Sequence, residues 1–235
     1  MDNCKSKLWQ NETVDMKLVL ASNNEGKLFE MQALFAPLVA NGISIISQSE
    51  LNVPEAPEPF KTFLENALTK ARNAARHTGL PALADDAGLC VDAFNGLPGV
   101  DTAYYATQFG LPKGDDNNVT ALLDQMKNVA NRRAALVSTL VAVRTPDDPE
   151  PLLAVGRAVG EIAKARIGAG GFGFDPVLFI SEIGKTFAEL SPKEKNTRSH
   201  RGQAARLMVE LIQKNWLGID PSCEVGGAQG GRSRA

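Results

Sequence analysis

The chain has 235 residues, of which 43% are hydrophobic, so it can bury one sizeable core without disulfides. Its 25 Lys and Arg nearly balance 27 Asp and Glu, and a net charge of -2 provides no overall field to hold nucleic acid or an anionic membrane. The three cysteines, Cys4, Cys90 and Cys223, lack zinc or disulfide spacing, which indicates a reducing compartment. No run approaches the roughly 18 apolar residues of a membrane span. We therefore expect a cytoplasmic protein without nucleic-acid or membrane partners.

The composition predicts one folded domain over residues 16–218. Residues 1–15 form a polar extension, too polar for the apolar part of a signal peptide. Residues 219–235 contain two Gly-Gly pairs and cannot support a packed element. We expect both ends to be mobile.

The first part of the chain reads as strand, turn and helix. Residues 17–21 predict a buried strand, and after a polar turn the apolar periodicity predicts a helix to about Leu38. Residues 43–46 predict a second strand, and the proline-rich stretch 54–59 cannot be helical.

The clearest helix covers residues 63–77, because its apolar side chains fall within one arc at 3.6-residue spacing. That arc contains Leu64, Ala67, Leu68, Ala71, Ala74 and Ala75. A strand at 81–84 then leads into Asp85-Asp86, and residues 89–94 predict another strand.

The second half predicts a long hairpin and a final helix. Residues 136–143 and 152–162 read as paired strands joined by a prolyl turn, and residues 201–216 as a helix. Alternating helices and strands with one antiparallel pair predict an α/β fold with a mixed central sheet flanked by helices.

One candidate anion site lies where the first strand meets its helix, because a helix N-terminus presents free backbone N–H groups. Its residues are Ser22, Asn23, Asn24, Glu25, Gly26 and Lys27. The segment is not a P-loop, since Leu28 follows the lysine and the glycine spacing is absent. The alternative is a capped helix with a solvated lysine.

Two carboxylates, Asp85 and Asp86, follow an apolar strand and precede Ala87-Gly88. Hard oxygen ligands at a strand end suit Mg²⁺, which takes a couple of carboxylates together with substrate phosphates and water. The alternative is an ordinary acidic surface turn.

Residues 168–173 formally match the G-x-G-x-x-G fingerprint of dinucleotide-binding folds. We reject that interpretation, because Pro176 opposes helix formation where the fingerprint requires a helix to begin. Two aromatic residues, Phe172 and Phe174, instead suggest a wall on which a purine base stacks. Either one could equally be a core residue beside a glycine turn.

Residues 193–202 concentrate cationic side chains before the last helix. Such a run is usually a solvated surface, and Ser199 could simply be the N-cap of that helix. Because the chain has only two histidines, His200 followed by Arg201 is also a plausible recognition element.

Taken together, these segments resemble the inosine triphosphate pyrophosphatase family. The matching motifs occur in family order from Ser22 to Gly202, which makes coincidence very unlikely. They are SNNEGK (22–27), FLENALTKAR (63–72), ADDAGL (84–89), GLPGV (96–100), GGFGFDP (170–176) and SHRG (199–202).

The resemblance implies a homodimer whose subunit has two lobes with a nucleotide cleft between them. It implies a Mg²⁺-dependent enzyme that hydrolyses non-standard purine triphosphates (ITP, dITP and XTP) to the monophosphate and pyrophosphate, cleaning the nucleotide pool. Residues 22–27 and Lys70 then bind the phosphates, and Glu58 and Asp86 ligate the metal. Asp86 is the proposed general base, supported by Asp85.

The base-recognising residues are also implied by the resemblance. They are Phe172, Gly173, Phe174, Asp175, Lys195, His200 and Arg201. His200 and Arg201 can donate hydrogen bonds to a keto oxygen at purine C6, which hypoxanthine and xanthine carry and adenine lacks.

Three positions depart from the family pattern. Ala87 stands where serine is common, so only a backbone contact to the substrate is left there. Tyr104 replaces a frequent arginine, and Arg157 lies near a frequent tryptophan. Two other function classes use the same charged residues: an ATP- or GTP-dependent transferase and a non-catalytic nucleotide sensor.

Overall fold

The computed structural model describes residues 16–219. The predicted extension at 1–15 and all but the first residue of the predicted tail at 219–235 lie outside the described residues. Among residues 16–219, no helix combines the length and the apolar character that crossing a membrane requires.

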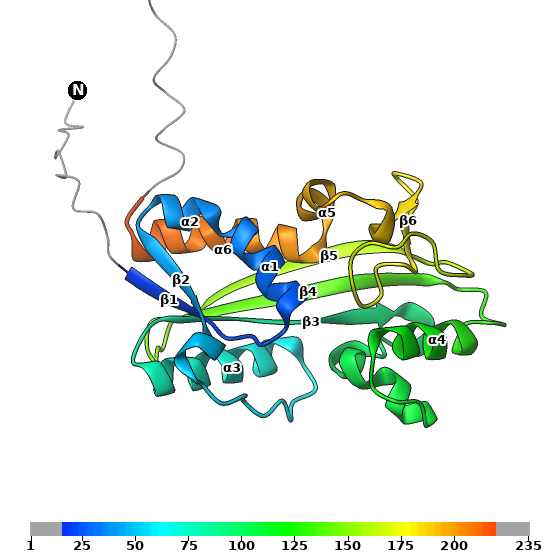
Figure 1. Ribbon diagram of the computed structural model, residues 1–235, viewed down its shortest axis with the longest axis horizontal. Helices are drawn as coiled ribbons and strands as arrows, with labels where there is room; N and C mark the ends of the chain where they lie inside the picture. The colour runs from blue at the N-terminus through cyan, green and yellow to red at the C-terminus, as the bar shows by residue number, and fades with distance from the viewer. Residues whose placement is uncertain (1–15, 220–235) are drawn as a thin grey trace, which may run out of the picture.

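Seven strands of the described region form one mixed sheet in the order β2-β1-β3-β4-β5-β6-β7 (Figure 1). Strand β1 pairs in parallel with β2 and β3, and every other neighbouring pair is antiparallel. The predicted α/β fold with a mixed sheet is confirmed. The strands are β1 (Met16–Leu20), β2 (Ile43–Ser47), β3 (Ala82–Val91), β4 (Arg133–Val143), β5 (Leu152–Ile162), β6 (Leu178–Ile180) and β7 (Lys185–Thr186).

Helices cover both faces of this sheet. In Figure 1, α1, α2, α5 and α6 lie on one side, and α3 and α4 lie on the other. The α-helices are α1 (Glu25–Leu34), α2 (Ala36–Ala40), α3 (Phe63–Thr78), α4 (Asp115–Gln125), α5 (Pro192–Arg198) and α6 (His200–Trp216). Four 3₁₀ segments connect them: η1 (Gln48–Leu51), η2 (Asp92–Phe94), η3 (Gly99–Phe109) and η4 (Phe187–Glu189).

The first predicted helix is broken in two. Helix α1 begins after Asn24, whose side chain accepts a hydrogen bond from the Lys27 N–H, and it ends at Leu34. Helix α2 then begins at Ala36 with Pro37 in its first turn. Because proline lacks an N–H donor and clashes with the preceding turn, it is tolerated at a helix start but interrupts a continuous helix.

Helix α3 follows its prediction closely. Thr62 caps it by accepting from the Glu65 N–H, and four alanines of the predicted arc are fully buried against the sheet. Their small side chains let the helix approach β3 and β4 closely. Leu64, in the first turn, is the exposed member of that arc.

The prediction of two short strands with Asp85-Asp86 at a strand end is wrong. Strand β3 is continuous from Ala82 to Val91, and β4 pairs with both aspartates, opposite Leu140 and Thr139. Side chains alternate between the faces of a strand, so the two carboxylates point to opposite faces of the sheet. Asp85 faces α1 and α6, and Asp86 faces α3.

The end of β1 explains why both carboxylates are reachable from one place. Strand β1 pairs with β3 only at Val19 and Leu20, opposite Ala82 and Leu83. Beyond Leu83, no strand of the described region takes over this edge of β3, although Pro98 forms an isolated bridge to Cys90. The free edge at the two aspartates is where the cleft lies.

Helix α6 is packed closely onto β5. A Cβ atom added at Gly156 would lie 1.9 Å from the carbonyl oxygen of His200, so only glycine permits this approach. Ala204, Ala205 and Met208 of α6 continue the contact in one apolar cluster with β1 and β4. This packing fixes the position of the first turn of α6, which carries His200 and Arg201.

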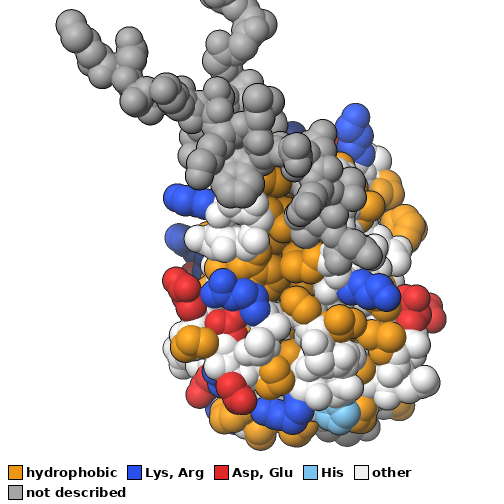
Figure 2. Space-filling model, turned by 90° about the vertical axis from the view of Figure 1, so that its left-hand side faces the viewer, with side chains coloured by type: hydrophobic (Ala, Val, Ile, Leu, Met, Phe, Trp, Pro, Cys, Tyr) orange, Lys and Arg blue, Asp and Glu red, His pale blue; other side chains and the backbone are white. Residues whose placement is uncertain are grey.

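Figure 2 looks onto the end of the molecule that lies farthest from α4 and shows apolar side chains in its middle, with Lys, Arg, Asp and Glu side chains around them.

Candidate active site

A cavity of about 260 Å³ opens at the free edge of β3. Of the predicted site residues, only Glu25 and Gly26 do not line it: Glu25 is exposed, and Gly26 lies beneath the Phe172 ring. The predicted residues that line the cavity are Ser22, Asn23, Asn24, Lys27, Glu58, Lys70, Asp85, Asp86, Ala87, Phe172, Gly173, Phe174, Asp175, Lys195, His200 and Arg201.

Asp85 is the centre of a buried ionic cluster. Its Oδ2 lies 2.9 Å from Lys27 Nζ and accepts hydrogen bonds from Arg201 at 3.1 and 3.2 Å, while Ser138 donates to Oδ1 at 2.6 Å. Burial works to raise the pKa of the Asp85 carboxyl, but the charges of Lys27 and Arg201 outweigh burial and hold it below its usual range. Asp85 is therefore a permanent anion that orients two cations.

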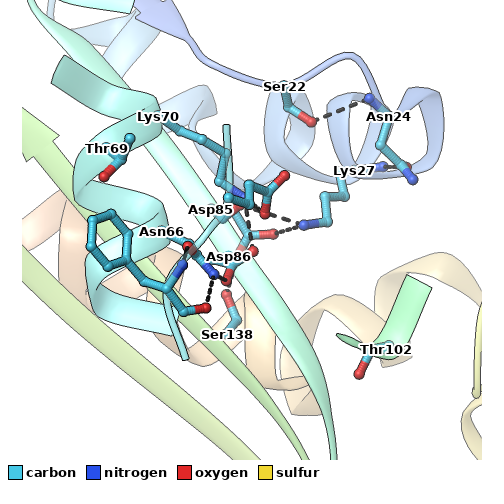
Figure 3. Close-up of polar contacts among 12 residues, drawn as sticks. Ser22, Asn24, Lys27, Asn66, Thr69, Lys70, Asp85, Asp86, Thr102 and Ser138 are labelled. Carbon is cyan, nitrogen blue, oxygen red and sulfur yellow. Dashed lines mark hydrogen bonds and ion pairs between the residues drawn. The ribbon is translucent and has the colours of Figure 1, made fainter. Parts of the chain in front are cut away.

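Asp86 has a different environment on the other face of β3 (Figure 3). Lys70 Nζ lies 2.8 Å from its Oδ1 and 3.0 Å from Glu58 Oε2, and the Asn66 amide donates to Oδ2 at 3.4 Å. Burial raises the pKa of the Asp86 carboxyl to about 6, against the opposing charge of Lys70. An adjacent pair of aspartates thus has one carboxyl that stays ionised and one that holds a proton more readily, a division typical of acid–base sites.

The two lysines respond to burial in different ways. Burial lowers the pKa of the Lys27 ammonium, and Asp85 only partly compensates. Burial also acts on Lys70, but Asp86 and Glu58 together outweigh it and raise the pKa of Lys70. Both lysines line the same cavity. They provide a local positive cluster for a polyanion, although the protein as a whole has no excess of positive charge.

Glu58 and Asp86 are the carboxylates that fit a divalent cation. Each has an oxygen within 3.0 Å of the same Lys70 Nζ, so the two groups converge on one point. Within residues 16–219, no three His, Cys, Asp or Glu side chains cluster into a complete metal cage. Two carboxylates with phosphate and water completing the shell suit Mg²⁺, which is usually held in this way.

The other end of the cavity carries the glycine loop (residues 168–175). Gly171 and Gly173 have φ angles of 73° and 60°, in the left-handed region that favours glycine. Between them, the half-buried Phe172 ring faces the cavity, with Lys195 Nζ 4.5 Å and Arg201 Cζ 5.6 Å from its centroid. Phe174 is 2% exposed and belongs to an apolar core cluster, so its bulk supports the loop from below.

Within the cationic run before α6, Lys193 and Arg198 are exposed, but Lys195 and Arg201 are buried, so the interpretation as a solvated surface is wrong for these two. Lys195 and Arg201 are 5% and 2% exposed, because Glu30 pairs with both at 2.6 Å. Lys195 also pairs with Asp175 at 2.5 Å. The sequence reasoning missed Glu30, although an acid one turn after Lys27 on the same helix was a usable signal.

His200 differs from Arg201 in having a free polar atom. Ser199 caps α6 by accepting from the Gly202 N–H, which places His200 at the first helical position. His200 is 4% exposed, and its Nδ1 has no hydrogen-bond partner among the described residues. Burial, followed by the charge of Arg201, holds the pKa of His200 well below its ordinary value. His200 therefore lines the cavity with one ring nitrogen that is buried and unpaired among the described residues, whereas each Arg201 guanidinium nitrogen already donates to Asp85 or Glu30.

Other residues that the sequence reasoning missed support the site through tertiary contacts. Gln48 donates to Asn23 Oδ1 at 3.0 Å, and Asn23 donates to Glu55 at 2.9 Å, which fixes the turn after β1. Tyr104, at the position that departs from the family pattern, lines the cavity with Lys113 4.2 Å from its ring centroid.

The fold and the cavity together define the class of protein. It is an α/β protein with one cleft that is lined by lysines, a pair of carboxylates and an aromatic residue of the glycine loop. Residues 18–211 match the Ham1 family, and the chain belongs to that family. The resemblance drawn from the motifs is confirmed.

Curated relatives and solved structures agree with this assignment. A protein of Albidiferax ferrireducens called dITP/XTP pyrophosphatase is 67% identical over 86% of this chain and 100% of its own length. A Paracidovorax citrulli protein of the same name is 68% identical with the same coverage. The structure of a HAM1 protein from Coxiella burnetii superposes with a TM-score of 0.78 at 40% identity, covering 85% of this chain and 99% of its own.

Proposed function

We propose that this protein hydrolyses non-standard purine nucleoside triphosphates, dITP, ITP and XTP, to the monophosphate and pyrophosphate, and so cleans the nucleotide pool. The names of relatives that are 67–68% identical over their full length support the substrate class. The observation that carries the proposal is the position of Asp86 in one cavity with Lys27, Lys70 and Phe172.

Asp86 acts as the general base of this reaction. Its carboxylate accepts a proton from a water molecule that attacks the α-phosphorus, and the bond from the α-phosphorus to the α,β-bridging oxygen breaks. Pyrophosphate leaves with the bridging oxygen. The Asn66 side-chain amide donates to the Asp86 carboxylate and to the Phe60 backbone carbonyl, which fixes the direction in which Asp86 faces.

The lysines bind the phosphate groups. Lys27 and Lys70 stabilise the negative charge that develops on the departing pyrophosphate, since cations placed in advance at a sheltered site act strongly. Asp85 holds Lys27 and Arg201 in place and stays ionised while doing so.

Glu58 and Asp86 are the residues that would hold Mg²⁺. A bound Mg²⁺ neutralises phosphate charge and orients the phosphates for attack. The convergence of these two carboxylates on the Lys70 ammonium supports the assignment, because a cation already occupies the point between them.

Purine selection falls to the glycine loop and His200. The Phe172 ring provides a face on which any purine stacks. The free Nδ1 of His200, in the tautomer that carries a proton there, donates to the keto oxygen at C6, and an adenine amino group would leave this donor unpaired. Arg201 then acts mainly by holding Asp85 and Glu30, a smaller part than the sequence alone suggested.

The proposal also includes the location and the oligomeric state of the protein: it acts in the cytoplasm, and it forms a homodimer. The family resemblance supports a dimer, and one face of β5 carries exposed apolar side chains, Leu153, Val155 and Val159, that a second copy could bury. Sedimentation equilibrium at several concentrations tests this; a monomer throughout would contradict it.

An assay of products tests the activity. With Mg²⁺ present, we expect pyrophosphate and monophosphate from ITP, dITP and XTP, and far slower reaction with ATP and GTP. Release of nucleoside diphosphate would instead indicate the transferase, and nucleotide binding without any product would indicate the sensor.

A further inference from the structure

Helix α4 contacts the glycine loop from the other side of the sheet. The backbone N–H of Gly173 donates to Asp115 Oδ2 at 2.7 Å, across 58 positions of sequence. Asp115 is the first residue of α4, which lies on the side of the sheet opposite α5 and α6 (Figure 1). The glycine loop is therefore held from both sides of the cavity.

A second contact anchors the approach to the loop on the same helix. One guanidinium nitrogen of Arg166 donates to the backbone carbonyl of Asp116 at 2.6 Å and to Thr120 Oγ1 at 2.8 Å. These bonds hold the chain just before residue 168 against the first two turns of α4. Of these contacts with α4, the Gly173 bond is the one made by a residue of the glycine loop, since Arg166 precedes the loop.

Gly173 is the neighbour of Phe172, whose position is tightly constrained. The Phe172 N–H donates to Asp175 Oδ2 at 2.9 Å. A Cβ atom added at Gly26 would lie 3.0 Å from the Phe172 ring, so the ring packs directly on the start of α1. A loop rich in glycine has little stiffness of its own, so the hydrogen bonds made by the two peptide groups that flank Phe172 determine where its ring lies.

We propose that Asp115 is a positioning residue that sets the place of Phe172 for base binding, without itself taking part in phosphate chemistry. This inference rests on the proposed function, because it assigns the role of one residue to the purine end of that site. A charged acceptor bonded to a backbone N–H is one of the stronger hydrogen bonds in proteins, and here both of its partners line the cavity.

The test compares Asp115→Ala and Asp115→Asn with a matched control, Asp116→Ala. Both aspartates are exposed in the first turn of α4, so removing either charge has a similar effect on helix stability. The Asp116 side chain makes none of the contacts that hold the loop, since Arg166 binds its backbone carbonyl. The Asp115→Asn variant would keep a side-chain oxygen that can accept from the Gly173 N–H.

We expect Asp115→Ala to raise KM for dITP about fivefold, with kcat within about twofold, as the loss of one hydrogen bond to a binding loop predicts. Inhibition by inorganic tripolyphosphate, which lacks a base, should be unchanged. Asp115→Asn should stay within about twofold of the wild type, and Asp116→Ala should match the wild type.

The inference is overturned if Asp115→Ala has the same KM as Asp116→Ala, or if tripolyphosphate inhibition weakens in parallel with dITP. Calorimetric affinity for ITP, measured on the same variants, separates this failure from that of the proposed function. If the wild type releases no pyrophosphate, the proposed function is refuted. The calorimetric affinity of Asp115→Ala for ITP, expected to be about fivefold weaker than that of the wild type, still tests the role of Asp115 in that case.

Discussion

Lys70 Nζ on α3 lies 2.8 Å from Asp86 Oδ1 on β3, and this pair joins a helix and a strand at the base of the cavity. The side chains of Lys70 and Asp86 are 14% and 8% exposed, so each partly neutralises the other away from bulk water. The same holds for Lys27 and Asp85 on the opposite face of β3. The charges of the site thus largely neutralise one another. When a triphosphate and its metal ion bind, the lysines must turn from the carboxylates to the phosphates, and the carboxylates must turn to the metal ion.

Removing Lys27 should weaken catalysis much more than it weakens folding. Losing one preorganised cation from a sheltered site costs about 3 kcal/mol of barrier, so we expect Lys27→Met to lower kcat/KM for dITP about 100-fold. Steady-state kinetics measure this. Lys61→Met is the matched control, because the Lys61 side chain is 82% exposed and its one ion pair, with Asp101, is a loose one at 3.8 Å. Equal losses in both variants would exclude a specific role for Lys27.

Chelation of divalent ions should abolish pyrophosphate release, and added Mg²⁺ should restore it. If Glu58 supplies one of two protein ligands, Glu58→Gln should raise the Mg²⁺ concentration for half-maximal activity about tenfold. The measurement is a Mg²⁺ titration at saturating nucleotide, with Glu161→Gln, an exposed acid on β5, as the control. An unchanged Mg²⁺ requirement in Glu58→Gln would remove Glu58 from the metal site.

His200 should make the protein less stable as the pH falls. Burial holds the pKa of folded His200 well below 6.5, whereas the unfolded chain takes up a proton near pH 6.5. The unfolded state then binds more protons, so this contribution to stability is complete above pH 6.5 and is lost as the pH falls below it. From pH 7.5 to 5.5 the loss is on the order of 1 kcal/mol.

Denaturant unfolding of wild type and His200→Asn at each pH measures this contribution. Asp86, whose pKa burial raises to about 6, acts in the opposite direction, so the comparison is between the two proteins and not along the wild-type curve. The free-energy difference between them should change by on the order of 1 kcal/mol over this pH range. A difference independent of pH would show that folded His200 accepts a proton.

Gly156 should be essential for the contact between β5 and α6. A Cβ atom there would meet the His200 carbonyl oxygen at 1.9 Å and the Ala204 nitrogen at 2.6 Å, so backbone must move. Overpacking of this kind predicts that Gly156→Ala lowers the free energy of unfolding by about 3 kcal/mol. Leu207→Ala, on α6 itself with a side chain that is 47% exposed, is the control. A stable Gly156→Ala protein with normal nucleotide affinity would contradict the packing account.

Much of the site could be predicted because its residues lie in compact motifs. Lys27, Lys70 and Asp86 were assigned from local pattern and resemblance, and they share one cavity. The long β4–β5 hairpin and helix α3 were equally clear from periodicity.

The rest depends on contacts between distant segments. Glu30 gains its importance only when α5 and α6 bring Lys195 and Arg201 to it, and Asp115 only when Gly173 folds back onto α4. The pattern around Asp85 and Asp86, an apolar strand before them and Ala87-Gly88 after them, predicts a strand end, but β4 supplies an antiparallel partner that keeps the strand continuous. Local sequence does not show such a partner strand. The pairing with β4 is what keeps Asp85 and Asp86 in one continuous strand, where they face different helices.

If Asp86 accepts the proton of the attacking water while other groups bind the nucleotide, replacing its carboxylate should separate turnover from binding. The most direct measurement is pyrophosphate release and calorimetric ITP affinity of Asp86→Asn beside the wild type. We expect Asp86→Asn to reduce turnover by about 10³-fold or more and to retain nucleotide affinity within about tenfold. Turnover equal to that of the wild type would contradict it.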